Sequence, residues 1–200
     1  EVLAAREDAE LQGFDVTEDG KTAALLWNVA GRSELAFLDL ATGKAAPGPK
    51  LPADVAGGLN FSKDGRLLAM TLFGSAAPAD AWVLERAAGR FRQVTHSPHA
   101  GVDLAGLVRP ELVRFEAHDG LELSGWLYRA PRGAGPGPIV LSFHGGPEGQ
   151  ERPTFSSDYQ ALLARVRSAA AGLGLEAAVM TFEPHPREFF AQRSGDLARA

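Results

Sequence analysis

Phe14-Asp-Val-Thr-Glu-Asp-Gly-Lys-Thr-Ala-Ala-Leu25 recurs about 45 residues later as Leu59-Asn-Phe-Ser-Lys-Asp-Gly-Arg-Leu-Leu-Ala-Met70. Each copy is a short alternating run, an Asp-Gly pair and a second apolar run. Asp-Gly supplies the positive φ angles of a tight hairpin turn, so each copy predicts two antiparallel strands. A repeat of about 40–45 residues with several short strands is typical of β-propeller blades. Any other antiparallel β meander fits the same rhythm.

Two further strands are predicted between and after these hairpins, over Glu34–Leu40 and Ala81–Glu85, and each is followed by a turn that contains glycine. We therefore predict partial propeller-like blades over residues 1–108. Two copies cannot close a ring, because propellers use typically 4–8 blades. An isolated pair of blades should leave an exposed sheet edge.

The composition is that of an ordinary soluble globular chain. The 200 residues are 45% hydrophobic and 22% charged, with a formal net charge of −5 and no cysteine. This charge gives no electrostatic reason to expect nucleic acid or an anionic membrane as a partner. No apolar run approaches the roughly 20 residues of a membrane helix, and no signal peptide is visible, so a cytoplasmic location is expected. The start at Glu1, without Met, suggests a fragment or a processed piece.

A second pattern begins at residue 109. His118-Asp119-Gly120 predicts a hairpin between strands over Leu112–Glu116 and Leu121–Tyr128. Ile139–Phe143 is an unbroken apolar run, which predicts a strand buried on both faces.

A helix and a strand are predicted next. Ser156 or Ser157 can cap a helix that runs to about Ala171, and Glu176–Phe182 is another strand candidate. Strand, helix and strand in this order predict a right-handed crossover in a parallel sheet. No spacing of carboxylates and histidines suggests a metal site, and no cofactor is expected.

Phe115-Glu-Ala-His-Asp-Gly-Leu-Glu-Leu-Ser-Gly-Trp-Leu-Tyr128, followed by Leu141-Ser-Phe-His-Gly-Gly-Pro147, resembles the start of the catalytic domain of prolyl oligopeptidase-family serine peptidases. The resemblance covers about residues 14–165. It implies that residues 109–159 begin an α/β-hydrolase-like domain and that the substrate is a peptide. A glycine-rich loop after an early strand lies beside the active site of such hydrolases, where backbone groups can approach a developing oxyanion. The candidates for this loop are His144, Gly145, Gly146 and Pro147, and the resemblance implies that His144 is a loop residue rather than the base.

The catalytic triad of this chemistry cannot be assigned. It needs a nucleophilic serine, a histidine that takes its proton and an acid that orients the histidine. No Gly-x-Ser-x-Gly occurs in the chain, and Ser142, Ser156 and Ser157 have no base partner by motif. No catalytic residue is therefore named, and peptide hydrolysis by these residues alone is not expected.

A second resemblance covers residues 160–200. Gln160-Ala-Leu-Leu-Ala-Arg-Val-Arg167 and Ala178-Val-Met-Thr-Phe-Glu-Pro-His-Pro-Arg-Glu-Phe-Phe190 resemble the adenylyltransferase part of bacterial bifunctional riboflavin kinase/FAD synthetases. Ligands bind at the carboxyl ends of parallel strands in such folds. The resemblance implies weak contact with ATP by Phe182, Pro184, His185 and Pro186. The plainer interpretation is that two prolines end a strand and leave one histidine exposed.

The synthetase family also needs a His-x-Gly-His motif before this helix. The corresponding residues here are Ser156-Ser157-Asp158-Tyr159, so adenylyl transfer is not expected. Gln160–Arg165 fits both families, and a switch within it explains both halves of the chain. Recombination, deliberate design and mis-joined sequence data are each compatible with such a switch.

The expected fold class is mixed β and α/β. Partial propeller blades are followed by a truncated parallel α/β unit, either hydrolase-like or nucleotidyltransferase-like. Three functional hypotheses follow. The first is an inactive fragment or chimera of a serine peptidase. The second is a remnant of an FAD synthetase, that is, an FMN adenylyltransferase, with a partial ATP site. The third is a non-catalytic chimeric fragment without a native function.

Overall fold

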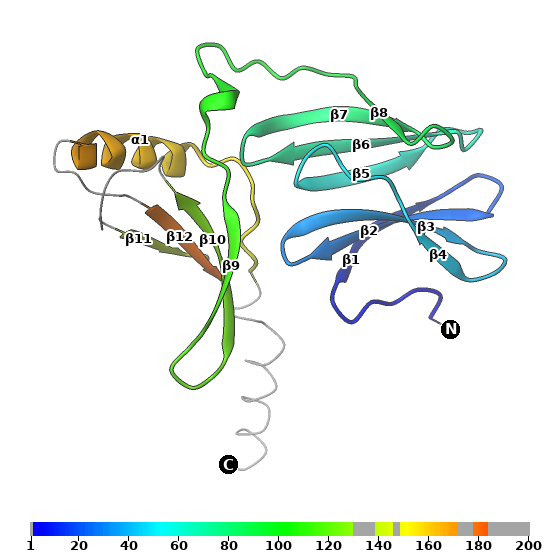
Figure 1. Cartoon of the computed structure of the whole chain (residues 1–200). Helices are drawn as coiled ribbons and strands as arrows, with labels where there is room; N and C mark the ends of the chain where they lie inside the picture. The colour runs from blue at the N-terminus through cyan, green and yellow to red at the C-terminus, as the bar shows by residue number, and fades with distance from the viewer. Residues whose placement is uncertain (1, 130–138, 146–148, 172–177, 184–200) are drawn as a thin grey trace. The chain divides into compact units, whose positions relative to one another are not determined.

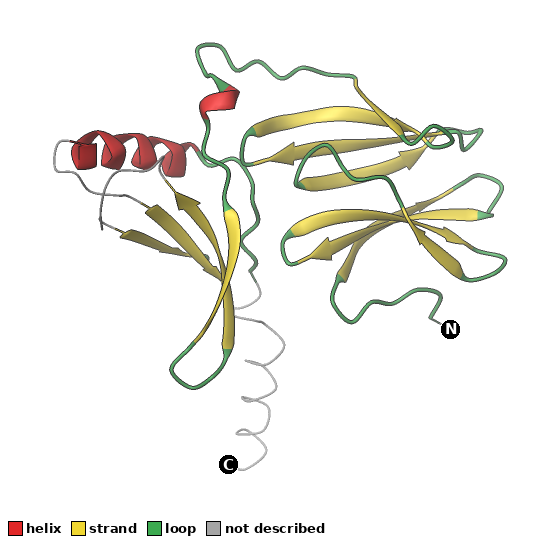
Figure 2. Ribbon diagram, viewed as in Figure 1, coloured by secondary structure: helices red, strands yellow, loops and turns green. Residues whose placement is uncertain are grey.

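A computed structural model describes residues 2–129, 139–145, 149–171 and 178–183. Within these residues the chain forms three four-stranded sheets and one α-helix (Figures 1 and 2). It divides into two compact units. The first is Glu1–Gly106 with Pro153–Phe155, and the second is Leu107–Arg152 with Ser156–Ala200.

The first unit consists of two consecutive antiparallel meanders, in which every strand pairs with its neighbours in the sequence. This organisation is the one that the repeat predicts for two blades. The first sheet comprises β1 (Glu10–Val16), β2 (Thr22–Val29), β3 (Arg32–Asp39) and β4 (Lys44–Pro47). The second sheet comprises β5 (Val55–Phe61), β6 (Leu67–Gly74), β7 (Ala77–Glu85) and β8 (Arg90–Gln93).

The two Asp-Gly turns have the same hydrogen bonds. The hydroxyl of Thr17 donates to Asp19 Oδ1 over 2.7 Å, and the hydroxyl of Ser62 donates to Asp64 Oδ1 over the same distance. In both turns the hydroxyl oxygen also accepts a bond from the backbone N–H five residues later. The glycines that follow have φ near +68° and +66°, as the turn requires. The sequence repeat is therefore also a repeat of local structure.

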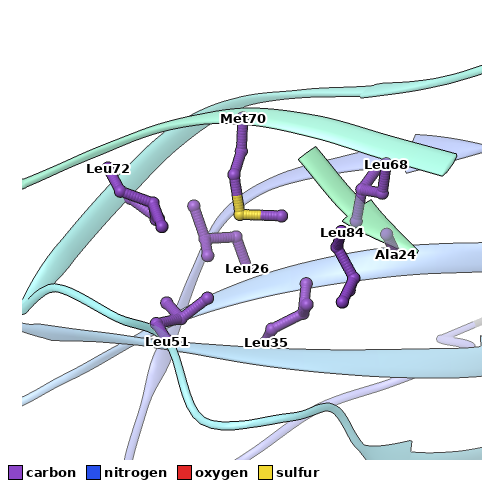
Figure 3. Close-up of a cluster of buried hydrophobic side chains, with 9 residues drawn as sticks. Ala24, Leu26, Leu35, Leu51, Leu68, Met70, Leu72 and Leu84 are labelled. Atoms are coloured by element: carbon purple, nitrogen blue, oxygen red, sulfur yellow. The ribbon is translucent and has the colours of Figure 1, made fainter. Parts of the chain in front are cut away.

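A shared apolar core joins the two sheets of this unit (Figure 3). Side chains alternate between the faces of a strand, so Ala24 and Leu26 of β2 lie on the face that packs against the second sheet. Leu68 and Leu72 of β6 meet them from that sheet, and Leu68 has no exposed surface. The buried members of this core are Ala24, Leu26, Leu35, Leu51, Ala56, Leu68, Met70, Leu72 and Leu84.

The N-terminal segment packs on the other face of β2. Ala4 and Ala9 contact a cluster that contains Trp27, and the Arg6 guanidinium lies 5.8 Å from the centre of the Trp27 ring. Arg6 also donates to Glu34 over 2.7 Å. As a result, β2 is covered on both faces.

Arg86 forms a polar link between the two sheets. Its guanidinium lies 5.1 Å from the ring centres of both Phe37 on β3 and Phe61 on β5. It also donates to the carbonyl of Gly65 over 2.6 Å. A cation between two aromatic faces is attracted by both rings, so this contact stabilises the packing of one sheet on the other.

Asp80 fixes the chain where it leaves the second sheet. This buried carboxylate accepts hydrogen bonds from Gln93, Thr95 and the backbone and hydroxyl of Ser97, over 2.8–3.1 Å. Burial alone would raise the pKa of Asp80, but the bonds from Thr95, Ser97 and Gln93 outweigh it and lower the pKa. The carboxylate therefore stays ionised and holds residues 93–97 against β7.

The second unit contains a mixed sheet in the order β11-β12-β10-β9, preceded by a 3₁₀ turn at Leu104–Gly106 in the first unit. Its elements are β9 (Glu111–Glu116), β10 (Glu122–Arg129), β11 (Ile139–Phe143), α1 (Ser157–Ala171) and β12 (Ala178–Glu183). Only β11 and β12 run parallel, as the strand–helix–strand pattern predicts. The hairpin predicted at His118-Asp119-Gly120 is also present, with β10 antiparallel to β9. Because β12 pairs antiparallel with β10, the described sheet is mixed, and its parallel part is the pair β11 and β12.

Helix α1 packs on this sheet through Leu163. Leu163 joins Trp126 and Tyr128 of β10 in a buried cluster, against which Val140 of β11 also packs. The Ser156 hydroxyl accepts from the Tyr159 N–H over 3.2 Å, which confirms Ser156 as the cap of the helix.

The expectation that both faces of β11 are buried is wrong. Leu141 is 52% exposed and Phe143 is 68% exposed, whereas Val140 contacts the core under α1. Alternation along the strand sends these two side chains to the face opposite Val140, where they remain exposed. In the described part of the chain, no helix is long and apolar enough to span a bilayer.

Candidate functional site

The glycine-rich loop begins directly after β11. His144 Nδ1 lies 3.4 Å from the Gly145 carbonyl, and within the described residues His144 Nε2 is buried without a hydrogen-bond partner. A methyl group placed on Gly145 would meet nothing within 4 Å, so the backbone at Gly145 has open space beside it. Gly146 and Pro147 lie outside the described residues.

Gly149 to Arg152, here called the return arm, brings the chain back beside the start of the loop. A methyl group on Gly149 would lie 2.7 Å from His144 Nδ1 and 2.8 Å from the Gly145 carbonyl oxygen. Only glycine fits such a close approach. Gly149 could not be predicted as a site residue from the sequence, because its need for glycine comes from a contact within the folded loop rather than from a motif.

Side chains from β10 and α1 hold the return arm. Trp126 Nε1 donates to the Glu151 carbonyl over 3.0 Å. The Tyr159 hydroxyl donates to Glu151 Oε1 over 3.4 Å and lies 3.1 Å from Ser142 Oγ. Burial is the largest influence on the Tyr159 hydroxyl and raises its pKa; the hydrogen bond with Ser142 lowers the pKa, and the Glu151 carboxylate raises it again, so the net shift is upward. The phenol therefore keeps the proton that it donates.

A clip between distant segments fixes the first turn of α1. The Gln160 amide donates to the Val108 carbonyl over 2.8 Å and accepts from the Val108 N–H over 3.0 Å. The helix that carries Tyr159 is thus tied to the strand-bearing segment that begins at Leu107.

Both predicted sites begin where the parallel strands β11 and β12 end. Phe143, the last residue of β11, pairs with Phe182 near the end of the parallel strand β12. Pro184, His185 and Pro186 lie outside the described residues. The positions where the synthetase family has its paired histidines, residues 156–159, instead cap α1 and support the return arm.

Ser142, one of the three serines for which no base partner was expected, stands two residues before His144. Its hydroxyl contacts Tyr159 rather than a histidine or a carboxylate. Among the described residues, no three histidine, aspartate or glutamate side chains gather where they could hold a metal ion. The site therefore offers open backbone at Gly145 and a supporting network beneath it.

The fold of this chain is similar to the folds of several solved peptidase structures. No family model and no curated sequence matches the chain. A puromycin-hydrolysing peptidase from Mycobacterium tuberculosis matches with a TM-score of 0.68 and 17% identity over 88% of this chain and 28% of its own. A puromycin hydrolase matches with a TM-score of 0.66 and 19% identity, over 88% and 27% of the two chains.

Prolyl oligopeptidase B from Galerina marginata also matches, with a TM-score of 0.66 and 16% identity over 92% of this chain and 25% of its own. The likeness is one of fold, and this chain spans about a quarter of the length of the structures that it matches. The comparisons give no support to the riboflavin kinase/FAD synthetase resemblance.

Proposed function

We propose that this chain is a fragment of a serine peptidase of the prolyl oligopeptidase kind. In this proposal residues 1–108 are propeller blades, residues 109–159 begin the catalytic domain, and the substrate of the complete enzyme is a peptide. The observation that carries the proposal is the open backbone at Gly145, directly after the outermost strand of the sheet. Exposed backbone groups at this place suit the binding of an oxyanion. The fold likeness over 88% of the chain supports the same assignment.

The proposed role of the loop is to contribute to oxyanion stabilisation, and the 200 residues do not hydrolyse peptides by themselves. No Gly-x-Ser-x-Gly supplies a nucleophile, and Ser142 is engaged with Tyr159. A fluorophosphonate probe should leave the protein unlabelled, and fluorogenic peptides should not be cleaved. Stoichiometric labelling of one serine would contradict the absence of a nucleophile.

A graft into an intact enzyme tests the peptidase assignment. In this chimera, residues 111–145 replace the superposed segment of the puromycin hydrolase. The chimera should retain the kcat/KM of the hydrolase to within about tenfold. The same graft with Gly145→Val should lose on the order of 100-fold, because a side chain then blocks the oxyanion donors. A folded graft without activity, or one indifferent to Gly145→Val, would refute the assignment.

The second candidate rests on Ala178–Phe190, whose sequence motif favours a remnant of an FAD synthetase with a partial ATP site. The domain boundary at residue 160, the weak ATP contact and the cytoplasmic location all stay predictions. Calorimetry with ATP or FMN should give no dissociation constant tighter than millimolar. A micromolar constant that is lost in His185→Ala would favour this candidate over the peptidase or over a chimera without a native function.

A further inference from the structure

The hydroxyl of Tyr159 lies between the two segments that the loop connects. It is 3.1 Å from Ser142 Oγ near the end of β11, and 3.4 Å from Glu151 Oε1 on the return arm. A phenol has a single proton. Because that proton goes to the Glu151 carboxylate, the Ser142 hydroxyl donates to Tyr159. One side chain of α1 therefore contacts both segments.

The return arm carries this connection to the start of the loop. Gly149, two residues before Glu151, approaches His144 and Gly145 so closely that a methyl group would lie within 2.8 Å of both. A displacement of Glu151 therefore also moves Gly149, which lies against the Gly145 carbonyl. The contacts run from Tyr159 through Glu151 and Gly149 to Gly145.

We propose that Tyr159 is a positioning residue whose hydroxyl sets the place of Gly145 relative to the end of β11. For the chemical role of Gly145 this inference rests on the proposed function. The placement itself does not depend on that role. The 3.4 Å bond to Glu151 is long for a hydroxyl donor. Loss of the hydroxyl should therefore loosen the loop locally rather than unfold the unit.

Trp126 and Tyr159 hold different atoms of Glu151. The indole N–H of Trp126 donates to the backbone carbonyl of Glu151, whereas the Tyr159 hydroxyl donates to the Glu151 carboxylate. Tyr159 is itself well fixed, since its ring meets Tyr128 edge-on with a centre-to-centre distance of 5.4 Å. Its backbone N–H is bonded to Ser156. A rigid phenol that reaches both segments can transmit a position from one to the other.

Nuclear magnetic resonance of the full ¹⁵N-labelled chain tests the proposal. Tyr159→Phe keeps the ring and removes the hydroxyl. The amide resonances of Gly145 and Gly149 should shift, and their ¹⁵N order parameters should fall below about 0.6, the range of flexible backbone. The His144 Hε1 resonance should shift, while the order parameters in β1–β8 stay unchanged. Glu151→Ala should have the same effect, and Glu151→Gln should restore the wild-type values because it keeps an acceptor oxygen.

Leu162→Ala is the matched control, because Leu162 packs against the same apolar cluster without touching the hydroxyl network. It should lower the melting temperature and leave the order parameters of Gly145 and Gly149 unchanged. Order parameters and amide shifts that stay at the wild-type values in Tyr159→Phe would overturn the proposal, as would equal effects of Glu151→Gln and Glu151→Ala. If Tyr159→Phe fails to fold, the comparison of Glu151→Ala with Glu151→Gln tests the proposal by itself. These signals are independent of turnover, so they stand apart from the graft that tests the peptidase assignment.

Discussion

Single residues decide the turns of this chain through very local contacts. Asp19 and Asp64 each lie two residues after a hydroxyl residue and directly before a glycine with positive φ, and both turns form the same hydrogen bonds. The third turn, at Asp119-Gly120, has Ala117 in place of the hydroxyl residue and keeps only the bonds to Asp119 and the backbone. Turn chemistry of this kind can be predicted from the sequence, because every partner lies within five residues.

The two repeated glycines should differ in their tolerance of alanine. Gly20 and Gly65 both have positive φ, so Gly20→Ala should cost about 1–2 kcal/mol of unfolding free energy. Gly65→Ala should cost at least about 1 kcal/mol more, because the new methyl would lie 3.1 Å from Thr17 Cγ2. Thr17 cannot rotate away without losing its hydrogen bonds. Urea unfolding of both variants measures the difference, and equal costs would refute it.

Asp80 should make stability depend on pH. Its folded pKa is lowered, so its contribution is present above the unfolded value of about 3.9 and is lost as pH falls through the folded pKa. In Asp80→Asn, an amide N–H would face the groups of Thr95, Ser97 and Gln93 that donate to the carboxylate in the wild type. The substitution should cost about 1–3 kcal/mol of unfolding free energy near neutral pH. Urea unfolding at several pH values should show the difference from wild type shrinking below about pH 4. A difference that is constant with pH would contradict this account.

At the scale of elements, the strands were more predictable than their surroundings. The repeat predicts hairpins because alternation and Asp-Gly pairs are local signals, and the apolar run at Ile139–Phe143 does form β11. What the sequence could not show is which faces are covered, since Leu141 and Phe143 have the composition of a buried strand but are exposed. The two hydrogen bonds between Gln160 and Val108 could not be predicted from the sequence either, because they join positions 52 residues apart.

The Gln160 clip should be important for the attachment of α1. Gln160→Ala removes two hydrogen bonds and should cost about 1–3 kcal/mol. Gln160→Glu should be no better, because a carboxylate would face the Val108 carbonyl without a proton to donate. Thermal unfolding followed by circular dichroism measures both variants. Arg165→Gln, at an exposed position of the same helix, is the control and should stay within about 0.5 kcal/mol of wild type.

At the scale of the whole molecule, the fold likeness covers 88% of this chain but only 28% of the first matched peptidase. The exposed pair Leu141 and Phe143 lies on the outermost strand of the second unit's sheet. Adjacent exposed apolar side chains of this kind favour association between molecules. The loop candidates can be named from sequence because they form a compact motif, whereas the network of Tyr159, Glu151 and Gly149 exists only once the chain has folded.

Because Leu141 and Phe143 are exposed on the same face of β11, the chain should self-associate through that face. The double variant Leu141→Thr/Phe143→Thr introduces polar, β-branched residues that suit a strand, and it should shift sedimentation toward the monomer. Leu3→Thr removes an exposed apolar side chain outside any strand and should leave the distribution unchanged. Analytical ultracentrifugation over a range of concentrations compares the three proteins. Association that persists in the double variant would place the contact elsewhere.

The order β11-β12-β10-β9 has a consequence for synthesis on the ribosome. In the first unit every strand pairs with its neighbour in the sequence, so each meander can close as soon as its own strands have emerged. In the second unit β12 separates β10 from β11. The nascent chain must therefore hold β11 without its partner until Glu183 has been translated. The second unit is thus the part of the chain that can complete its sheet only late in translation.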